Sequence, residues 1–410
     1  MKKNINFYIL IYLTILFFFS AFFLYQKHDV SNDSTISEWL INYEGGFTKR
    51  GLIGQISIYF SNFFLIKLRD TILIFQTLII GIYFILIYQF LKNIFYNKIF
   101  ILAIFTPIFV LYPVAEIEVL ARKEIFIFIY FLSYTFIPID KKLNKFFYKL
   151  FLLPISILIW EPIIFFILFF IFLDLIENKI KKIDGIFFLQ ISSYIPSIIL
   201  ALYVALNPIS EEGHKIMADL LMQDFNEKCY MSCELLKSKS SIYQQFQGNF
   251  DKYSIEIFFR YILIFIIGFG PLFILLFNSK LKNKILFFNK FKNLLVPYLI
   301  LLSPIIVLFA MGYDWGRWVN ISYVLSIISF VYIYKYNLIN FSENFLKNKF
   351  FINLKKKFFV LIIIFYCFGW NPKTAITGDV ASFPGYRIPY KTLKFILEES
   401  PASYFRKLIN

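Results

Sequence analysis

The chain has 410 residues, of which 59% are hydrophobic and only 17% are charged, and its mean hydropathy is +0.68. A soluble protein of this length has too little interior to cover so much apolar surface. The net charge of +16 does not indicate nucleic-acid binding, because the lysines lie in short loops between apolar segments, as the positive-inside rule describes. The composition predicts an all-α polytopic membrane protein that forms one integral membrane domain over residues 1–410.

Apolar segments near the length of a bilayer crossing follow one another along the chain. We expect about 11 transmembrane helices from their number and length. Lysine-bearing connectors place the N-terminus in the cytoplasm and leave the C-terminus outside. Two short segments that meet at Trp160-Glu161-Pro162 form either two spans or a re-entrant pair. The predicted spans are residues 7–25, 71–92, 97–114, 123–138, 148–160, 162–176, 185–207, 254–277, 294–311, 318–336 and 357–370.

Three longer segments fall on the external side: a first loop at 26–70, a large loop at 208–253 and a tail at 371–410. The first loop ends in an amphipathic stretch, Gly51 to Lys67, which we expect to lie in the membrane interface. Cys229 and Cys233 are spaced for a small disulfide loop in an oxidising compartment, although the sequence alone leaves their pairing open. The only histidines are His28 and His214, and no cluster has zinc spacing, so we expect no metal site and no cofactor.

The first loop contains the most glycine-rich stretch of the chain, Tyr43–Gly54, with four glycines that allow sharp bends or close approach to a ligand. Glu44 precedes the pair Lys49 and Arg50, which places a candidate acid or base beside a candidate anion site. The alternative is a glycine-rich turn whose charges face water.

Arginine and lysine are sorted across the predicted membrane. On this topology every arginine is external, whereas the cytoplasmic connectors use lysine alone. The positive-inside rule does not distinguish the two residues and so does not explain the sorting. A guanidinium group binds phosphate or carboxylate through a planar fork of donors, which favours an anion site at the external face. The alternative is that some arginines pair with neighbouring acids. The seven arginines are Arg50, Arg69, Arg122, Arg260, Arg317, Arg387 and Arg406.

Two further motifs carry candidate chemistry. The first motif is Tyr313–Trp318, in which Asp314 is a candidate base and Arg317 is a candidate anion ligand. Between them, Trp315 is a candidate stacking surface for a sugar. The alternative is that the motif is an interfacial aromatic belt with a local ion pair. Glu161 is either a general base or a helix cap before Pro162.

Charges also gather at residues 116–124, where Arg122-Lys123-Glu124 follow two glutamates. They line a wet cavity or form a salt-bridge set. Arg260 is expected to pair with Glu256. The candidate catalytic residues are Glu44, Glu161 and Asp314, and the candidate substrate-binding residues are Lys49, Arg50, Arg122, Trp315, Arg317 and Arg387.

The many-span, lysine- and phenylalanine-rich chain, its long external loop and the stretch Glu44-Gly45-Gly46-Phe47-x-x-Arg50-Gly51 resemble bacterial O-antigen polymerases of the Wzy type, within the wider multi-span lipid-linked-sugar glycosyltransferases. The resemblance implies a multi-pass protein of the bacterial inner membrane with a periplasmic active face. Its implied substrate is an undecaprenyl-pyrophosphate-linked oligosaccharide, and a chain-length regulator is a further expected partner. The growing chain would move from its lipid pyrophosphate to a sugar of the incoming unit, with a carboxylate as base and arginines at the leaving group.

Two alternatives stay open. One is a glycosyltransferase that uses a polyprenyl-phosphate monosaccharide. The other is a flippase for lipid-linked oligosaccharides, which would place paired charges along a path through the bilayer. The charges of this sequence instead gather at one face, and Arg260 is almost the only one expected deep in a span.

Overall fold

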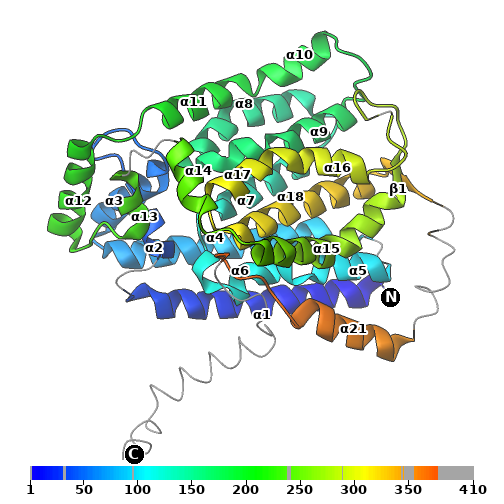
Figure 1. The fold of residues 1–410 in the computed structure, drawn as a ribbon, viewed down its shortest axis with the longest axis horizontal. Coiled ribbons are helices and arrows are strands. Elements are labelled where there is room, and N and C mark those ends of the chain that lie inside the picture. Colours follow the sequence, from blue (N-terminus) through cyan, green and yellow to red (C-terminus); the bar gives the residue numbers. More distant parts are fainter. Residues whose placement is uncertain are drawn as a thin grey trace, which may run out of the picture.

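The computed structural model describes residues 2–30, 34–94, 97–237, 242–288, 290–342, 345 and 355–376. It is mostly helical, as predicted, and its long helices lie side by side in one bundle (Figure 1). Strands β1 and β2 pair antiparallel, with Ser279 opposite Phe341. The elements are α1 (Lys2–His28), α2 (Ser34–Trp39), α3 (Gly51–Phe64), α4 (Leu68–Leu91), α5 (Lys98–Phe105), η1 (Pro107–Leu111), α6 (Tyr112–Ala115), η2 (Ile117–Val119), α7 (Glu124–Phe136), α8 (Lys142–Ile159), η3 (Glu161–Phe166), α9 (Ile167–Glu177), α10 (Gly185–Ser192), α11 (Ile195–Leu206), α12 (Glu211–Phe225), α13 (Met231–Glu234), η4 (Leu235–Lys237), α14 (Ile242–Phe250), α15 (Ile255–Phe277), β1 (Ser279–Leu281), α16 (Leu295–Leu302), η5 (Ser303–Ile305), α17 (Ile306–Met311), α18 (Trp315–Lys335), β2 (Ile339–Phe341) and α21 (Lys356–Phe368).

Within the described residues, six helical segments are long and apolar enough to cross a membrane. Shorter apolar helices stand at other predicted spans, namely α7, α16 to α17 and α21, and α8 and α9 occupy the two segments around Trp160. The number of crossings beyond six stays a prediction. The six segments are Ile5–His28, Leu68–Leu91, Lys98–Ala115, Gly185–Leu206, Ile255–Phe277 and Trp315–Lys335.

Helix α18 is the core of the bundle, because every residue from Trp315 to Ile333 is buried. Helices α10 and α11 form part of the outer surface and expose large apolar side chains such as Phe188, Ile199 and Leu202. A helix that exposes such a surface needs an apolar solvent around it. The arrangement therefore supports a membrane protein with α18 at its centre.

The segment from α5 to α6 is broken by a π-type turn at η1, where Phe109 leaves helical backbone angles. The break frees backbone carbonyl groups in the interior, which must find new donors. The Asn320 side-chain amide, from α18, donates to the carbonyl oxygens of Ile108 (2.9 Å) and Phe109 (3.0 Å). This contact fixes the chain that leads into residues 116–124.

Helices α2, α3, α12, α13 and α14 gather at one end of the bundle, on the left of Figure 1, whereas β1 and the N-terminus lie at the other end. We call the end that holds α2, α3, α12, α13 and α14 the arginine end, because four of the five arginines of the described chain pair there with Glu38 or Glu227: Arg50, Arg69, Arg122 and Arg317. Arg260 pairs with Glu256 (3.1 Å), as predicted.

Helix α3 is the amphipathic helix predicted in the first loop. It buries Ile53 and Ile58 against the bundle and exposes Tyr59 and Phe63 on its other side. An exposed apolar stripe of this kind suits the membrane interface.

The external loops predicted at 26–70 and 208–253 contact each other through the backbones of Gly45 and Gly213. A Cβ atom added to Gly45 would lie 1.7 Å from the carbonyl oxygen of Gly213, so only glycine fits there. Arg69 adds an ion pair with Glu227. These contacts join two segments that are far apart in the sequence into one unit at the arginine end.

A second group of charges is buried at the opposite end of α18. Lys145 pairs with Glu177 (2.7 Å) and Lys149 with Asp174, and each of the four side chains is at most 3% exposed. Tyr332, in the last turn of α18, accepts a hydrogen bond from Lys145 (3.0 Å). Charges are therefore buried away from the arginine end as well, because Lys145 and Lys149 pair with acids of α9 instead of facing water. The depth of Arg260 in the membrane stays a prediction.

We predict that Gly45→Ala destabilises the protein by roughly 1–3 kcal/mol, because the new methyl group overlaps the Gly213 carbonyl. Thermal unfolding in detergent measures the change. Gly248→Ala, in α14, is the matched control, since no atom lies within 4 Å of its added Cβ. Equal unfolding temperatures for both variants would contradict the glycine contact between the loops.

Candidate functional site

The centre of the arginine end is a buried carboxylate, Glu38 of α2, with no exposed side-chain surface. Its Oε1 accepts a hydrogen bond from Nη2 of Arg122. The same oxygen lies 3.7 Å from Nη1 of Arg50 and 3.8 Å from Nη2 of Arg317. Three guanidinium groups from different segments therefore converge on one oxygen atom.

Each arginine also reaches a second carboxylate. Arg50 binds Glu161 through two donors, Nε to Oε2 (2.9 Å) and Nη2 to Oε1 (2.8 Å). Such bidentate pairs are the strongest and most directional ion pairs in proteins.

Arg317 binds Glu124 in the same way, at 3.0 and 2.9 Å, and its Nη1 donates to Asp314 at 2.6 Å. Nη1 of Arg122 lies 3.9 Å from Asp314. Together with Lys123, the set has four cations and four carboxylates, so the network is close to neutral.

The network forms where several helices begin. Arg50 precedes α3, Lys123 precedes α7, Glu161 opens η3, and Asp314 precedes α18. Helix N-termini carry partial positive charge and unpaired N–H groups, which stabilise carboxylates and bind phosphates. The helix starts and the arginines therefore make this end of the bundle attractive to anions.

The backbone at the network is held in uncommon conformations. Arg50 has φ 62° and Ala121 has φ 54°, in the left-handed region that costs energy for residues other than glycine. The surroundings hold both: Lys123 Nζ donates to the Arg50 carbonyl, and Trp39 Nε1 donates to the Ala121 carbonyl (2.9 Å). Strained residues that the surrounding structure fixes are typical of functional sites.

Burial and charge act in opposite directions on Glu38. Burial alone would raise its pKa, but Arg122, Arg317 and Arg50 hold the pKa well below its usual range. The carboxylate at the centre is therefore ionised.

The pairs differ in their access to solvent. The side chains of Arg317 and Glu124 are each 3% exposed, whereas Arg50 is 23%, Glu161 22% and Asp314 33% exposed. An anion from solution would therefore meet Arg50, Glu161 and Asp314 first.

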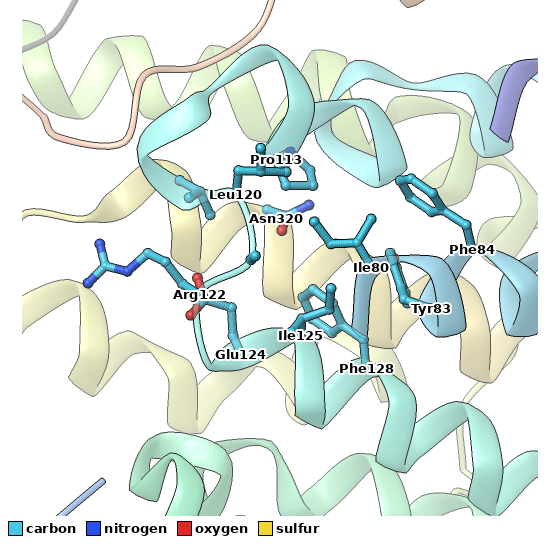
Figure 2. Close-up of a pocket in the computed structure, with 12 residues that line it drawn as sticks. Ile80, Tyr83, Phe84, Pro113, Leu120, Arg122, Glu124, Ile125, Phe128 and Asn320 are labelled. Atoms are coloured by element: carbon cyan, nitrogen blue, oxygen red, sulfur yellow. The ribbon is translucent and has the colours of Figure 1, made fainter. Parts of the chain in front are cut away.

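A small cavity lies behind the network, lined by Arg122, Glu124, Asn320 and apolar side chains of α4 and α7 (Figure 2). Its volume of about 20 Å³ has room for one water molecule. Figure 2 shows the Arg122 guanidinium pointing away from the apolar lining residues. This cavity is therefore too small for a ligand much larger than a water molecule.

Five of the predicted site residues meet in the network: Arg50, Arg122, Glu161, Asp314 and Arg317. The salt-bridge interpretation of residues 122–124 also describes the observed contacts.

The other predicted site residues lie elsewhere. Glu44 is exposed and accepts a hydrogen bond from Gln55 (2.6 Å), and Lys49 is exposed beside the network. The Trp315 ring is 5% exposed and enclosed by other aromatic rings, and its Nε1 donates to the Phe309 carbonyl (2.7 Å). Stacking of a sugar on Trp315 is therefore not supported: this residue packs the start of α18. Arg387 lies outside the described residues.

Sequence reasoning missed Glu38 and did not select Lys123 or Glu124 as site residues. Glu38 lies in a six-residue helix between two loops, and no local motif marks it. The one available signal was the adjacent Trp39, which anchors α2 to the chain before Arg122.

No protein-family model matches this chain, and neither the curated proteins nor the solved structures contain a significantly similar one. The interpretation of the site therefore rests on its own geometry and chemistry.

We predict that Glu38→Gln destabilises the protein by roughly 3–5 kcal/mol at neutral pH, because it leaves the buried guanidinium groups of Arg122 and Arg317 and the partly exposed one of Arg50 without their shared charge. Chemical unfolding in detergent measures the change. Glu256→Gln removes an exposed carboxylate that also pairs with an arginine, and should change stability by less than about 1 kcal/mol. Similar losses in both variants would contradict a central role for Glu38.

The low pKa of Glu38 also predicts how the destabilising effect of Glu38→Gln depends on pH. A carboxyl group whose pKa is lower in the folded state stabilises the fold above its unfolded pKa, about 4.3, and loses this contribution as pH falls further. The stability difference between wild type and Glu38→Gln should be constant above about pH 5 and shrink below it. A difference that grows on acidification would show that Glu38 is not ionised by its arginines.

Proposed function

We propose that this chain is a membrane glycosyltransferase that joins lipid-linked oligosaccharide units, in the manner of an O-antigen polymerase. The undecaprenyl-pyrophosphate-linked chain would bind at the arginine end, which we assign to the periplasmic face of the bacterial inner membrane. The proposal includes about 11 crossings of the membrane. It also includes a chain-length regulator as a partner of the protein.

The convergence of Arg50, Arg122 and Arg317 on one end of an apolar bundle is the observation that carries the proposal. A lipid-borne pyrophosphate would arrive at the membrane surface at this level. Arg50 and Glu161 form the exposed edge of the network, so a phosphate can take the place of the Glu161 carboxylate on the Arg50 guanidinium.

This exchange would link substrate binding to catalysis. While Glu161 is bound to Arg50 it is a weak base, because its charge is neutralised. When phosphate occupies Arg50, Glu161 is released and can accept the proton of the acceptor hydroxyl group. The hydroxyl oxygen then bonds to the anomeric carbon of the growing chain, and the bond from that carbon to the pyrophosphate breaks.

The electron pair of the broken bond leaves on the pyrophosphate oxygen, where Arg50 and the helix N-termini stabilise the new charge. Asp314, the other exposed carboxylate of the network, is placed to bind sugar hydroxyl groups. Arg122 and Arg317 would hold the network in shape, since both are buried and paired.

A flippase for lipid-linked oligosaccharides is the second candidate function. The buried group of Lys145, Lys149, Asp174 and Glu177 favours it, because paired charges inside a membrane protein often mark a transport path. Both charge groups, however, lie at the ends of α18, and each is internally paired. A transferase that uses a polyprenyl-phosphate monosaccharide would use the same arginine end.

We predict that Arg50→Ala and Glu161→Gln each reduce polymer formation by about 100-fold or more, since they remove the phosphate ligand and the base. The measurement is the lipopolysaccharide ladder of a deletion strain that carries each variant. Arg260→Ala and Lys98→Ala are the controls, because Arg260 pairs with the exposed Glu256 of its own helix and not with Glu38 or Glu161, and Lys98 starts α5. Normal ladders with Arg50→Ala would reject the site.

The deletion strain itself separates the candidates. A single repeat unit on the lipopolysaccharide core indicates a polymerase, and no repeat unit indicates a flippase or an earlier transferase. Chains of normal length that lack one sugar substituent indicate the monosaccharide transferase.

A further inference from the structure

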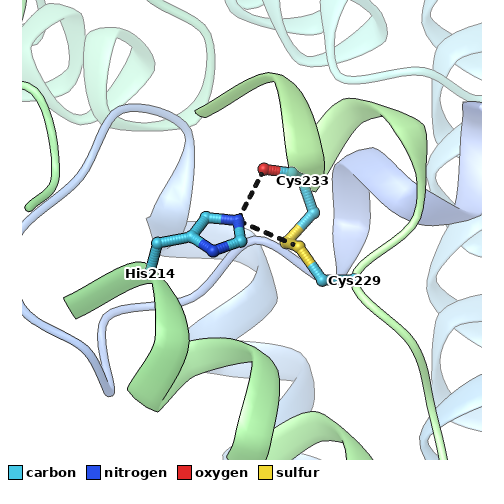
Figure 3. A group of neighbouring side chains, drawn as sticks. All are labelled: His214, Cys229 and Cys233. Carbon is cyan, nitrogen blue, oxygen red and sulfur yellow. Dashed lines mark hydrogen bonds between the residues drawn. A yellow bond between two sulfur atoms is a disulfide. The ribbon is translucent and has the colours of Figure 1, made fainter. Parts of the chain in front are cut away.

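The second large loop contains a compact group of three metal-ligand side chains. Cys229 and Cys233 are joined by a disulfide, and His214 of α12 lies against it (Figure 3). The His214 Nε2 atom is 3.2 Å from Cys229 Sγ and 3.1 Å from the Cys233 carbonyl oxygen. The three ligand atoms all lie within 4.8 Å of one another, and all three residues are buried.

The surroundings are apolar. The group packs with Ile41, Ile209, Met217 and Leu236. An isolated charge would be costly in this environment. A Zn²⁺ ion held by two thiolates and one neutral imidazole has no net charge, so this combination suits the pocket.

We propose that reduction of the Cys229–Cys233 disulfide converts this group into a Zn²⁺ site with His214, Cys229 and Cys233 as ligands. An external dithiol supplies two electrons and two protons, and it becomes a disulfide while the two cysteines become thiols. Zn²⁺ then displaces the two thiol protons. Three protein ligands and one water molecule complete the tetrahedral coordination that zinc prefers.

His214 is placed to be a ligand without a change in its packing. Its Nε2 faces the sulfur atoms, and its Nδ1 is buried with no hydrogen-bond partner among the described residues. When Nε2 binds the metal, the ring proton resides on Nδ1. Cys229 is 9% exposed, whereas Cys233 is fully buried, so an incoming dithiol reaches the Cys229 side of the disulfide first.

The site has a structural consequence at the arginine end. Cys229 and Cys233 flank the start of α13, which packs on α2: the Ser232 backbone N–H donates to Ser37 Oγ (3.3 Å). Glu38 is the next residue of α2. Zn²⁺ would hold the two cysteines together when the disulfide is absent, and so preserve the support of Glu38.

Cobalt binding to the full-length protein in detergent tests the proposal. After reduction and removal of the reductant, Co²⁺ should bind one ion per chain with a thiolate charge-transfer band and the strong visible bands of tetrahedral cobalt. Zn²⁺ should displace it, and affinity should rise with pH because binding releases protons. The same protein kept oxidised should show no such spectrum. The experiment uses a Cys367→Ser background, since Cys367 of α21 is the third cysteine of the chain.

His214→Gln is the decisive variant, and it leaves the disulfide intact before reduction. It should weaken Co²⁺ binding by at least about tenfold, since even loss of a residue that only supports a ligand has an effect of this size. Equal affinity in wild type and His214→Gln, or absence of the charge-transfer band, would overturn the proposal. A reduced wild type that aggregates on size-exclusion chromatography would also overturn it, because the site must survive loss of the disulfide.

Discussion

One buried carboxylate holds the arginine end together. Glu38 has no exposed surface and shares one oxygen atom among Arg122, Arg50 and Arg317. Without it, three guanidinium groups would lie close together in an apolar setting, which is unfavourable by several kcal/mol, on the order of 3–5. The starts of α3, α7 and α18 meet at this point because each supplies a charge that the others require.

The charges of the network nearly cancel, and this property shapes the proposed chemistry. An open cluster of arginines in a membrane protein would bind any anion, whereas a neutral network admits only one that competes with its own carboxylates. The competition is easiest at Arg50 and Glu161, which are partly exposed and on the edge. A phosphate group has the geometry for the fork of Arg50, and its arrival frees the carboxylate beside it.

The sequence predicted a helical membrane protein and the meeting of Arg50, Arg122 and Arg317, because arginine was confined to one predicted face. It did not predict Glu38, whose short helix has no motif, or the burial of Lys145 and Lys149, whose partners lie more than twenty residues away. Trp315 was misinterpreted because its motif is also that of a packed helix start. His214 was not expected to join the cysteines, because only the folded loop brings it to Cys229.

The central claim is that Arg50 exchanges its carboxylate partner for a lipid-borne phosphate. The most direct measurement is the affinity of the purified protein, in lipid nanodiscs, for undecaprenyl pyrophosphate. The account predicts at least about tenfold weaker binding for Arg50→Lys, which keeps the charge but loses the planar fork, and unchanged binding for Arg260→Lys. Equal affinity in the two variants would contradict it.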